Sequence, residues 1–429
     1  MLIVAEHSRV SEKGPRATTW PPHYVRSLSL AIPAILLGFQ ISGWVFAVMA
    51  LQQGRVDFRA LYTGGYIVRS GNAHLLYDYS SQLSFENSLV SPRSVTIPFD
   101  HLPYEALFFA PFSFLQFKTA YFAFLFVNLV VLALSILSIR RWTPTLNCIY
   151  SWLTPVIMAV FLPTAVALMQ GQDSVLLLAC LTAVFAALES GGDLTAGAVL
   201  SLGMFKFQIV LPIALLFLLW KRWRFIMGFS ASTIALLVAS FALTGKQAAR
   251  AYFGLLMSMS VGLHSAADQV RLGVSPSAMP NLRGLVIGLL GHKAPSPWEQ
   301  GVIVLLSVAV MVAAYLRGLH WPVRGKLLVA IVAATLVSYH SLFHDMAILL
   351  LPMLVLLNEC IAAIPAGPPA QRNVAASAAL LFISPVLFCF APGSFFIEGL
   401  ATCSFFYALL GWNRRSPVPS SVLAAGGIC

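Results

Sequence analysis

Long apolar segments recur along this chain, and they constrain its fold more than any other feature of the sequence. A membrane-spanning helix needs about 20 mostly apolar residues, and many windows of the chain supply them. Hydrophobic residues make up 59% of the 429 positions and charged residues only 10%. A soluble domain would have about 25% charged residues. The sequence therefore predicts an all-α, multi-pass integral membrane protein.

The apolar segments divide the chain into one transmembrane domain, 28–412, between cytoplasmic tails at 1–27 and 413–429. Segment 28–50 is longer than the apolar part of a signal peptide, about 7–15 residues, so we expect it to stay as an anchor. About twelve spans are predicted in all. They cover residues 28–50, 102–117, 119–139, 148–168, 174–189, 194–220, 224–244, 300–317, 326–344, 346–364, 375–391 and 396–412.

Basic residues predict the orientation. The chain has a formal net charge of +11, and most of its Lys and Arg clusters lie at segment ends, where the positive-inside bias places the cytoplasm. Two hydrophilic segments, 51–101 and 245–299, then fall on the outer side. They mix apolar and polar residues at helical spacing, which predicts interfacial helices. The expected partner is the lipid bilayer. No basic stripe suggests a nucleic acid.

Asp57 directly follows the first predicted span, in a chain with only 15 Asp and Glu residues. Arg55 and Arg59 lie two residues to either side of it. A carboxylate at the outer mouth of a span is where an enzyme that acts on a membrane-embedded donor would hold a general base. The alternative is a solvated loop carboxylate with no role in chemistry.

Three polar residues in apolar segments are further candidates. Lys206 interrupts the run 194–220, and ionisable residues inside spans usually face a cavity or a partner; the alternative is a lysine that snorkels to the interface. His340 and His344 are four residues apart and would share a helix face next to Asp345. They are candidate ligands of a phosphate or a sugar hydroxyl, or members of a structural polar cluster.

No cofactor is expected, although a divalent metal stays an open alternative. The motif H-E-x-x-H is absent, since positions 341–343 are Ser-Leu-Phe, and the six cysteines form no C-x-x-C. Asp173 is expected to cap the helix that begins at Ser174. Gln172 could bind sugar hydroxyls, but the predicted topology places it on the wrong side of the membrane unless the helix is broken, so we leave it out of the core site. Glu105 is expected to hold an interfacial helix or to pair with an arginine.

The order of motifs in the chain resembles that of glycosyltransferase family 87, from about residue 45 to residue 360. No single motif is specific; their order and their spacing to the spans carry the resemblance. The motifs are Asp57 with Tyr62, Gly65 and Gly71, Leu-Tyr-Asp at 76–78, His-Leu-Pro-Tyr-Glu at 101–105, Gly-Gln-Asp-Ser at 171–174, Lys-Phe-Gln at 206–208, Asn-Leu-Arg-Gly-Leu at 281–285 and His-Ser-Leu-Phe-His-Asp at 340–345.

The resemblance implies a bundle of the GT-C class and a membrane enzyme that transfers a hexose, often mannose, from a polyprenyl-phosphate donor on the outer side. The acceptor would be a glycan or glycolipid, and the location a bacterial plasma membrane. The chain departs from the family at 206–208, where Lys-Phe-Gln replaces the frequent Lys-Pro-Gln. Asp57 also lacks the second acidic residue common in such enzymes, which puts a bound metal in doubt.

Together these considerations predict Asp57 as the base of a single, inverting displacement. A lipid phosphate needs little protonation to leave, so one carboxylate is sufficient. The alternative function is a flippase or transporter of lipid-linked sugars, which would need polar residues and broken helices at matching places in both halves. The residues predicted to bind the donor phosphate or sugar are Arg55, Arg59, Lys206, Gln208, Arg283, His340 and His344.

Overall fold

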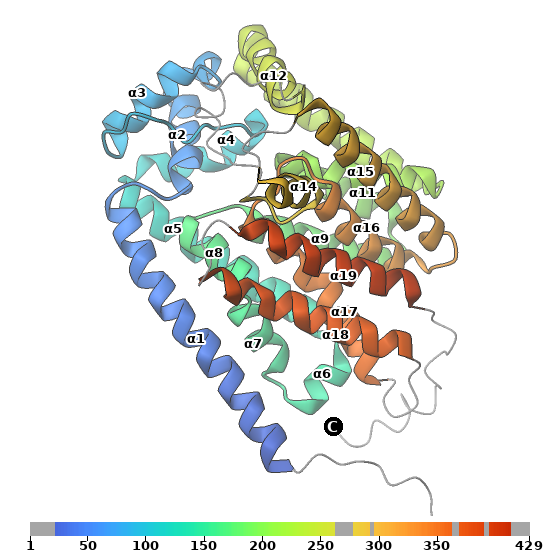
Figure 1. Cartoon of the computed structure of the whole chain (residues 1–429). Coiled ribbons are helices and arrows are strands. Elements are labelled where there is room, and N and C mark those ends of the chain that lie inside the picture. Colours follow the sequence, from blue (N-terminus) through green and yellow to red (C-terminus); the bar gives the residue numbers. More distant parts are fainter. Residues whose placement is uncertain (1–21, 262–277, 292–295, 363–368, 390–393, 413–429) are drawn as a thin grey trace, which may run out of the picture.

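A computed structural model of the chain describes residues 22–261, 278–291, 296–362, 369–389 and 394–412 (Figure 1). These residues form helices and connecting loops with no strand among them, so the predicted all-α class is confirmed. Most of the N-terminal tail, the C-terminal tail and part of the second outer segment lie outside the described residues.

The described part of the chain contains six helices long and apolar enough to cross a membrane. A seventh span results if the bent pair Leu153–Val160 and Leu162–Gln170, which meet at 57°, counts as one. The predicted count of about twelve is not confirmed. Several predicted spans are shorter or broken helices, and hydropathy alone does not register a break. The six are Ala34–Gln52, Phe117–Arg140, Asp193–Leu219, Trp223–Met257, Pro297–Gly318 and Phe343–Ala362.

Three short helices, with the neighbouring end of α12 (Trp223–Val261), form one end of the molecule (Figure 1). They are α2 (Phe58–Arg69) and α3 (Tyr79–Leu89) of the first outer segment, and α4 (Pro103–Phe109), which lies in the segment 102–117 that was predicted as the second span. α2 packs closely on α4, because a Cβ atom at Gly65 would lie 2.5 Å from the backbone of Phe109. Phe58 stacks on Phe124 of α5 (Phe117–Arg140) with ring centroids 5.4 Å apart. Aromatic packing thus attaches this layer to the bundle.

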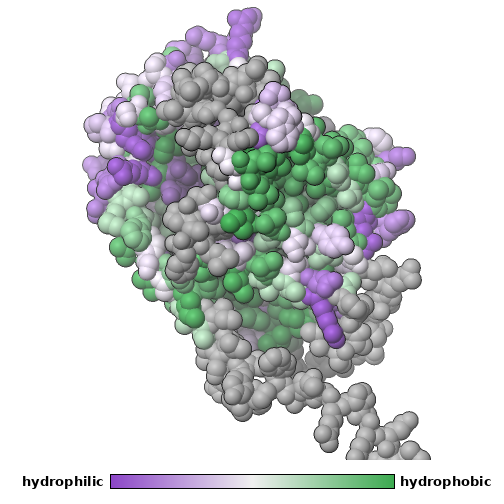
Figure 2. Space-filling model, in the orientation of Figure 1, coloured by the Kyte–Doolittle hydropathy of each residue, from purple (hydrophilic) through white to green (hydrophobic). Residues whose placement is uncertain are grey.

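The remaining helices form the bundle below this layer. In Figure 2 hydrophilic residues gather on the side of α2 and α3, and a broad hydrophobic surface covers the neighbouring bundle. The bundle elements are α1 (Pro22–Gln52), α5 (Phe117–Arg140), α6 (Pro144–Ile149), α7 (Leu153–Val160), α8 (Leu162–Gln170), α9 (Ser174–Glu189), α10 (Asp193–Leu202), α11 (Phe207–Leu219), α12 (Trp223–Val261), α14 (Leu282–Leu290), α15 (Pro297–Gly318), α16 (Val323–Val337), α17 (Leu350–Ala362), α18 (Pro369–Ile383) and α19 (Glu398–Gly411).

Three interruptions of the bundle helices position the site. A turn at Gly171, which has a left-handed φ of +64°, separates α8 from α9. The 3-10 turn η3 (Gly203–Lys206) lies between α10 and α11, and α16 ends at Val337, before η5 (Phe343–Leu349). Irregular backbone at membrane depth is tolerated only where protein buries it or where it lines a polar cavity. The three interruptions meet at such a cavity.

Candidate active site

A cavity of about 520 Å³ lies where the first outer segment meets the three interruptions. Sites for small molecules commonly have this size. Its wall combines acidic, basic and amide side chains from segments far apart in the sequence. The polar lining residues are Arg55, Asp57, Arg93, Thr96, Asp100, His101, Gln172, Lys206, Gln208, Tyr339, His340, His344 and Asp345.

Asp57 is a half-buried carboxylate that the protein holds in one orientation. α2 begins directly after it. Its Oδ2 accepts a hydrogen bond of 2.7 Å from Nε2 of Gln172, and its backbone N–H donates to Oε1 of Gln170 over 3.3 Å. The side chain therefore faces the cavity from a fixed place on the wall, as a base needs.

Gln172 lies on the same side as Asp57, so its predicted exclusion from the site is wrong. The left-handed conformation of Gly171 turns the chain sharply between α8 and α9 and brings Gln172 to Asp57. The buried Asn128 donates from Nδ2 to the backbone oxygen of Gln172 over 3.1 Å. The topological prediction failed because it treated α8 and α9 as two full spans.

Asp173 does not cap α9; its side chain makes no capping hydrogen bond there. Its Oδ1 lies 3.0 Å from Nζ of Lys206, and the same Nζ lies 3.1 Å from Oδ1 of Asp345. Asp345 also accepts hydrogen bonds from the Ser174 hydroxyl, 2.8 Å, and the Leu342 N–H, 2.9 Å. Lys206 is only 4% exposed, so it faces a cavity and two carboxylates and does not snorkel.

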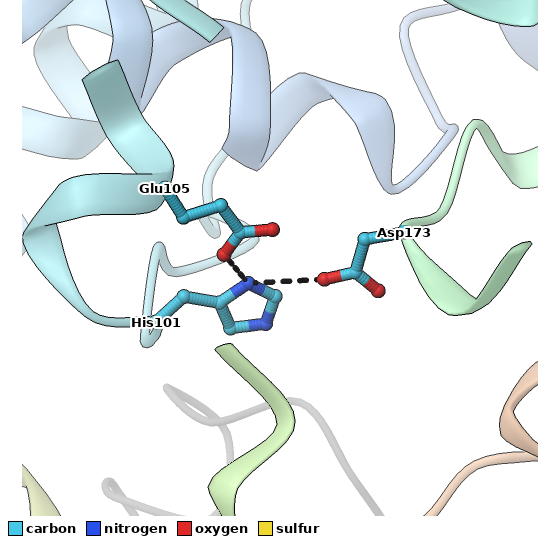
Figure 3. Close-up of side chains that lie close together, drawn as sticks. All are labelled: His101, Glu105 and Asp173. Atoms are coloured by element: carbon cyan, nitrogen blue, oxygen red, sulfur yellow. Dashed lines mark hydrogen bonds and ion pairs between the residues drawn. The ribbon is translucent and has the colours of Figure 1, made fainter. Parts of the chain in front are cut away.

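His101 joins this ionic cluster to the first outer segment (Figure 3). Its Nδ1 contacts the carboxylate of Glu105 and lies 3.3 Å from Oδ2 of Asp173, while Nε2 lies 3.3 Å from Oδ1 of Asp100. Burial lowers the pKa of His101, but the nearby charges of Glu105 and Asp173 outweigh it and raise the pKa to about 9. Burial raises the pKa of Glu105. The imidazole is therefore cationic at neutral pH.

Within the described residues, His101, Glu105 and Asp173 are the group whose side chains could hold a metal ion, with ligand atoms within 4.8 Å of one another. Lys206 and the protonated His101 already supply positive charge to these carboxylates. The absence of a cofactor stays a prediction.

Glu105 pairs with a histidine at this site, whereas the sequence analysis expected it to pair with an arginine or to hold an interfacial helix.

His340 and His344 both line the cavity but do not share a helix face. α16 ends at Val337, which leaves His340 in an irregular segment and His344 in η5. Nε2 of His344 lies 3.6 Å from Oδ1 of Asp345. Burial lowers the pKa of His340, so at neutral pH this side chain is an uncharged imidazole that can donate or accept a hydrogen bond.

Two of the predicted donor-binding arginines lie outside the set of cavity-lining residues. Arg59 is fully buried, and its Nε donates to Oε2 of Glu86 at 2.8 Å. Arg283 donates from Nη1 to the backbone oxygen of Tyr339 over 2.9 Å. The predicted contact of these two side chains with the donor has no support in the structure, because neither lines the cavity and each donates to a protein group. Arg55 and Gln208 line the cavity, and their contact with the donor stays a prediction.

The sequence analysis missed six polar residues of the wall, which are Arg93, Thr96, Asp100, His101, Gln172 and Tyr339. The first three lie in the irregular segment before α4, which carried no motif, and Tyr339 lies in the irregular segment after α16. His101 and Gln172 belonged to recognised motifs, and the four-residue spacing of His101 and Glu105 was a usable signal for a paired site. Their meeting with Asp173 depends on contacts between distant segments.

The fold and this cavity define a multi-pass membrane protein with a polar, ionic site built from interrupted helices. Residues 102–352 match the model of glycosyltransferase family 87. The match covers more than half of the chain, and the chain belongs to this family, as the sequence resemblance indicated. It is therefore a membrane glycosyltransferase. The matched residues include Asp173, Lys206 and Asp345, whereas Asp57 precedes them. No curated protein and no solved structure matches the chain.

Proposed function

We propose that the protein transfers a hexose, with mannose as the first candidate, from a polyprenyl-phosphate donor to a hydroxyl group of a glycan or glycolipid. Asp57 is the general base. The observation that carries this proposal is the carboxylate of Asp57, which Gln172 orients on the wall of a cavity of about 520 Å³. The same wall carries arginine and histidine side chains suited to a phosphate and a sugar.

The proposed reaction is a single displacement. The acceptor hydroxyl gives its proton to Asp57 while its oxygen forms a bond to the anomeric carbon. The bond from that carbon to the phosphate oxygen breaks, and the lipid phosphate leaves with the electron pair. Cationic side chains stabilise the charge that develops on the leaving phosphate. One displacement inverts the configuration at the anomeric carbon.

An apolar groove beside the cavity supports a lipid-linked donor. Its volume is about 760 Å³, and its lining comes from α11, α12, α15 and the end of α16. α11 connects the two sites, because Gln208 faces the cavity and Leu211 and Leu215 line the groove. Val337 lines the groove two residues before Tyr339, which lines the cavity. A polyprenyl chain in this groove would place its phosphate at the cavity.

We place the cavity on the outer side of a bacterial plasma membrane, since this orientation leaves most basic clusters in the cytoplasm. Membership of a glycosyltransferase family favours catalysis over the alternative of a lipid-linked sugar flippase or transporter.

Purified protein, incubated with a panel of undecaprenyl-phosphate hexoses and with nucleotide sugars, tests the proposal. We expect a mass increase of one hexose on the acceptor with a lipid donor and none with a nucleotide sugar. The anomeric configuration of the product, determined by NMR, should be opposite to that of the donor. Transfer from nucleotide sugars alone, or a retained configuration, would overturn the donor class or the mechanism.

A further inference from the structure

The cavity wall carries several cations, but protein carboxylates neutralise some of them. Lys206 lies between Asp173 and Asp345, at 3.0 and 3.1 Å. His101 lies among three carboxylates. Neither side chain can meet a bound phosphate without competing with these internal partners.

Arg55 and Arg93 differ from these two cations. Both line the cavity, and within the described part of the chain neither guanidinium forms an ion pair with a protein carboxylate. Both side chains carry a permanent positive charge. Their charge is therefore available to a ligand in the cavity. Arg93 is half-buried and Arg55 exposed, so Arg93 is better shielded from water and salt.

The backbone of Arg93 is held from both sides by one residue. Oδ1 of Asn87 accepts from the Arg93 N–H at 2.8 Å, and Nδ2 of Asn87 donates to the Arg93 carbonyl at 3.0 Å. These two hydrogen bonds to one side chain fix the backbone position from which the Arg93 side chain extends.

Arg59 in turn holds the segment that precedes Arg93. Its Nη1 donates to Oγ of Ser91 at 3.0 Å, and its Nη2 donates to the Ser91 carbonyl at 2.8 Å. Nη2 also donates to Oδ1 of Asn87 at 3.1 Å. The buried Glu86 balances the charge of Arg59. Arg59 therefore supports the backbone at Ser91, two residues before Arg93.

We propose that Arg93, together with Arg55, binds the phosphate of the lipid donor, and that Asn87 and Arg59 are positioning residues for Arg93. A guanidinium offers a planar fork of N–H donors that matches phosphate oxygens. A preorganised fork also stabilises the phosphate as it leaves, at no reorganisation cost. This inference rests on the proposed function and names the residues that recognise its donor.

Binding of undecaprenyl phosphate, with undecaprenol as the uncharged control, tests the inference without any sugar. The wild-type protein in detergent or nanodiscs should prefer the phosphate. Arg93→Gln should weaken phosphate binding by about tenfold to a hundredfold, the loss expected for a hydrogen bond to a charged group. Undecaprenol binding should not change. Arg93→Lys should retain part of the preference for the phosphate. The control Arg141→Gln removes an exposed arginine outside the cavity and should retain the full preference.

Asn87→Ala tests the positioning, because it leaves the side chain of Arg93 intact. It should lower the ratio of phosphate to alcohol binding, whereas loss of fold would weaken both ligands together and lower the melting temperature. A full phosphate preference in a folded Arg93→Gln variant would overturn the inference. If phosphate binding depends on Arg93 but no lipid-linked hexose is a donor, the phosphate site stands and the proposed function fails.

Discussion

Two pairs of candidate spans in this protein differ in burial and in regularity. In the candidate spans of α1 and α15, 17% and 11% of the apolar window is buried inside the molecule. In the spans Asp193–Leu219 and Phe343–Ala362 the shares are 56% and 78%. The first two run without a break, whereas the second two contain the 3-10 turns that carry Lys206 and Asp345. In these two spans the interrupted backbone, with its polar side chains, lies where protein surrounds it.

The largest expected effect concerns Asp57, which follows α1 in the chain and lines the same cavity as Lys206 and Asp345 of the interrupted spans. Asp57→Asn keeps the size of the side chain but removes the base, so the rate of sugar transfer should fall by about 10²–10⁴. Donor binding should change little. Asp57→Glu moves the carboxylate by one methylene and should retain part of the activity, because positioning contributes much of the effect. Transfer at the wild-type rate by the Asn variant would remove Asp57 from catalysis.

The contrast between buried and lipid-facing helices also predicts a difference in stability. Lys206→Met leaves Asp173 and Asp345 buried without their shared cation, which should cost about 3–5 kcal/mol. Lys118→Met, at an exposed position at the start of α5, should cost much less. Thermal unfolding of the two variants in the same detergent measures the difference. Equal melting temperatures would mean that the ionic cluster contributes nothing to the stability of the interrupted spans.

The histidines of the third interruption should affect activity more than stability. If His340 or His344 contacts the donor, its replacement by Ala removes one hydrogen bond to a charged group, and transfer should slow by about tenfold to a hundredfold. Steady-state rates of both single variants and of the double variant are the measurement. Unchanged rates in all three variants would mean that the two histidines shape the cavity wall and do not contact the donor.

The smallest expected effect is a pH dependence of stability. The folded state raises the pKa of His101 to about 9, from about 6.5 in the unfolded chain, and it raises that of Glu105 as well. Both groups bind protons more tightly when folded, so the unfolding free energy should fall as pH rises, from about 4.5 upward for Glu105 and from about 6.5 through 9 for His101. His101→Gln should flatten this decline, and His320→Gln, at an exposed position, should preserve it. A steeper decline in the His101 variant would contradict the assignment.

The membrane class, the family and the place of two candidate residues, Asp57 and Lys206, at a cavity could be predicted from the sequence, because each depends on local composition or on motif order. Apolar length predicts membrane helices wherever they occur, and a charge such as Lys206 inside an apolar run signals a cavity or a partner without contact information. Asp57 was recognisable from its place after the first span. The number of spans was not, since hydropathy averages over a broken helix and a straight one in the same way.

The tertiary structure decided which charged side chains are available to a ligand and which are paired with another residue of the protein. Gln172 reaches Asp57 across 115 residues, Ser174 reaches Asp345 across 171, and Arg59 finds Glu86 27 residues away. No local pattern encodes these pairings, so Arg59 and Arg93 look alike in the sequence although one is neutralised and the other faces the cavity. The physical reason is that the cost of burying a charge depends on the partner that folding brings to it.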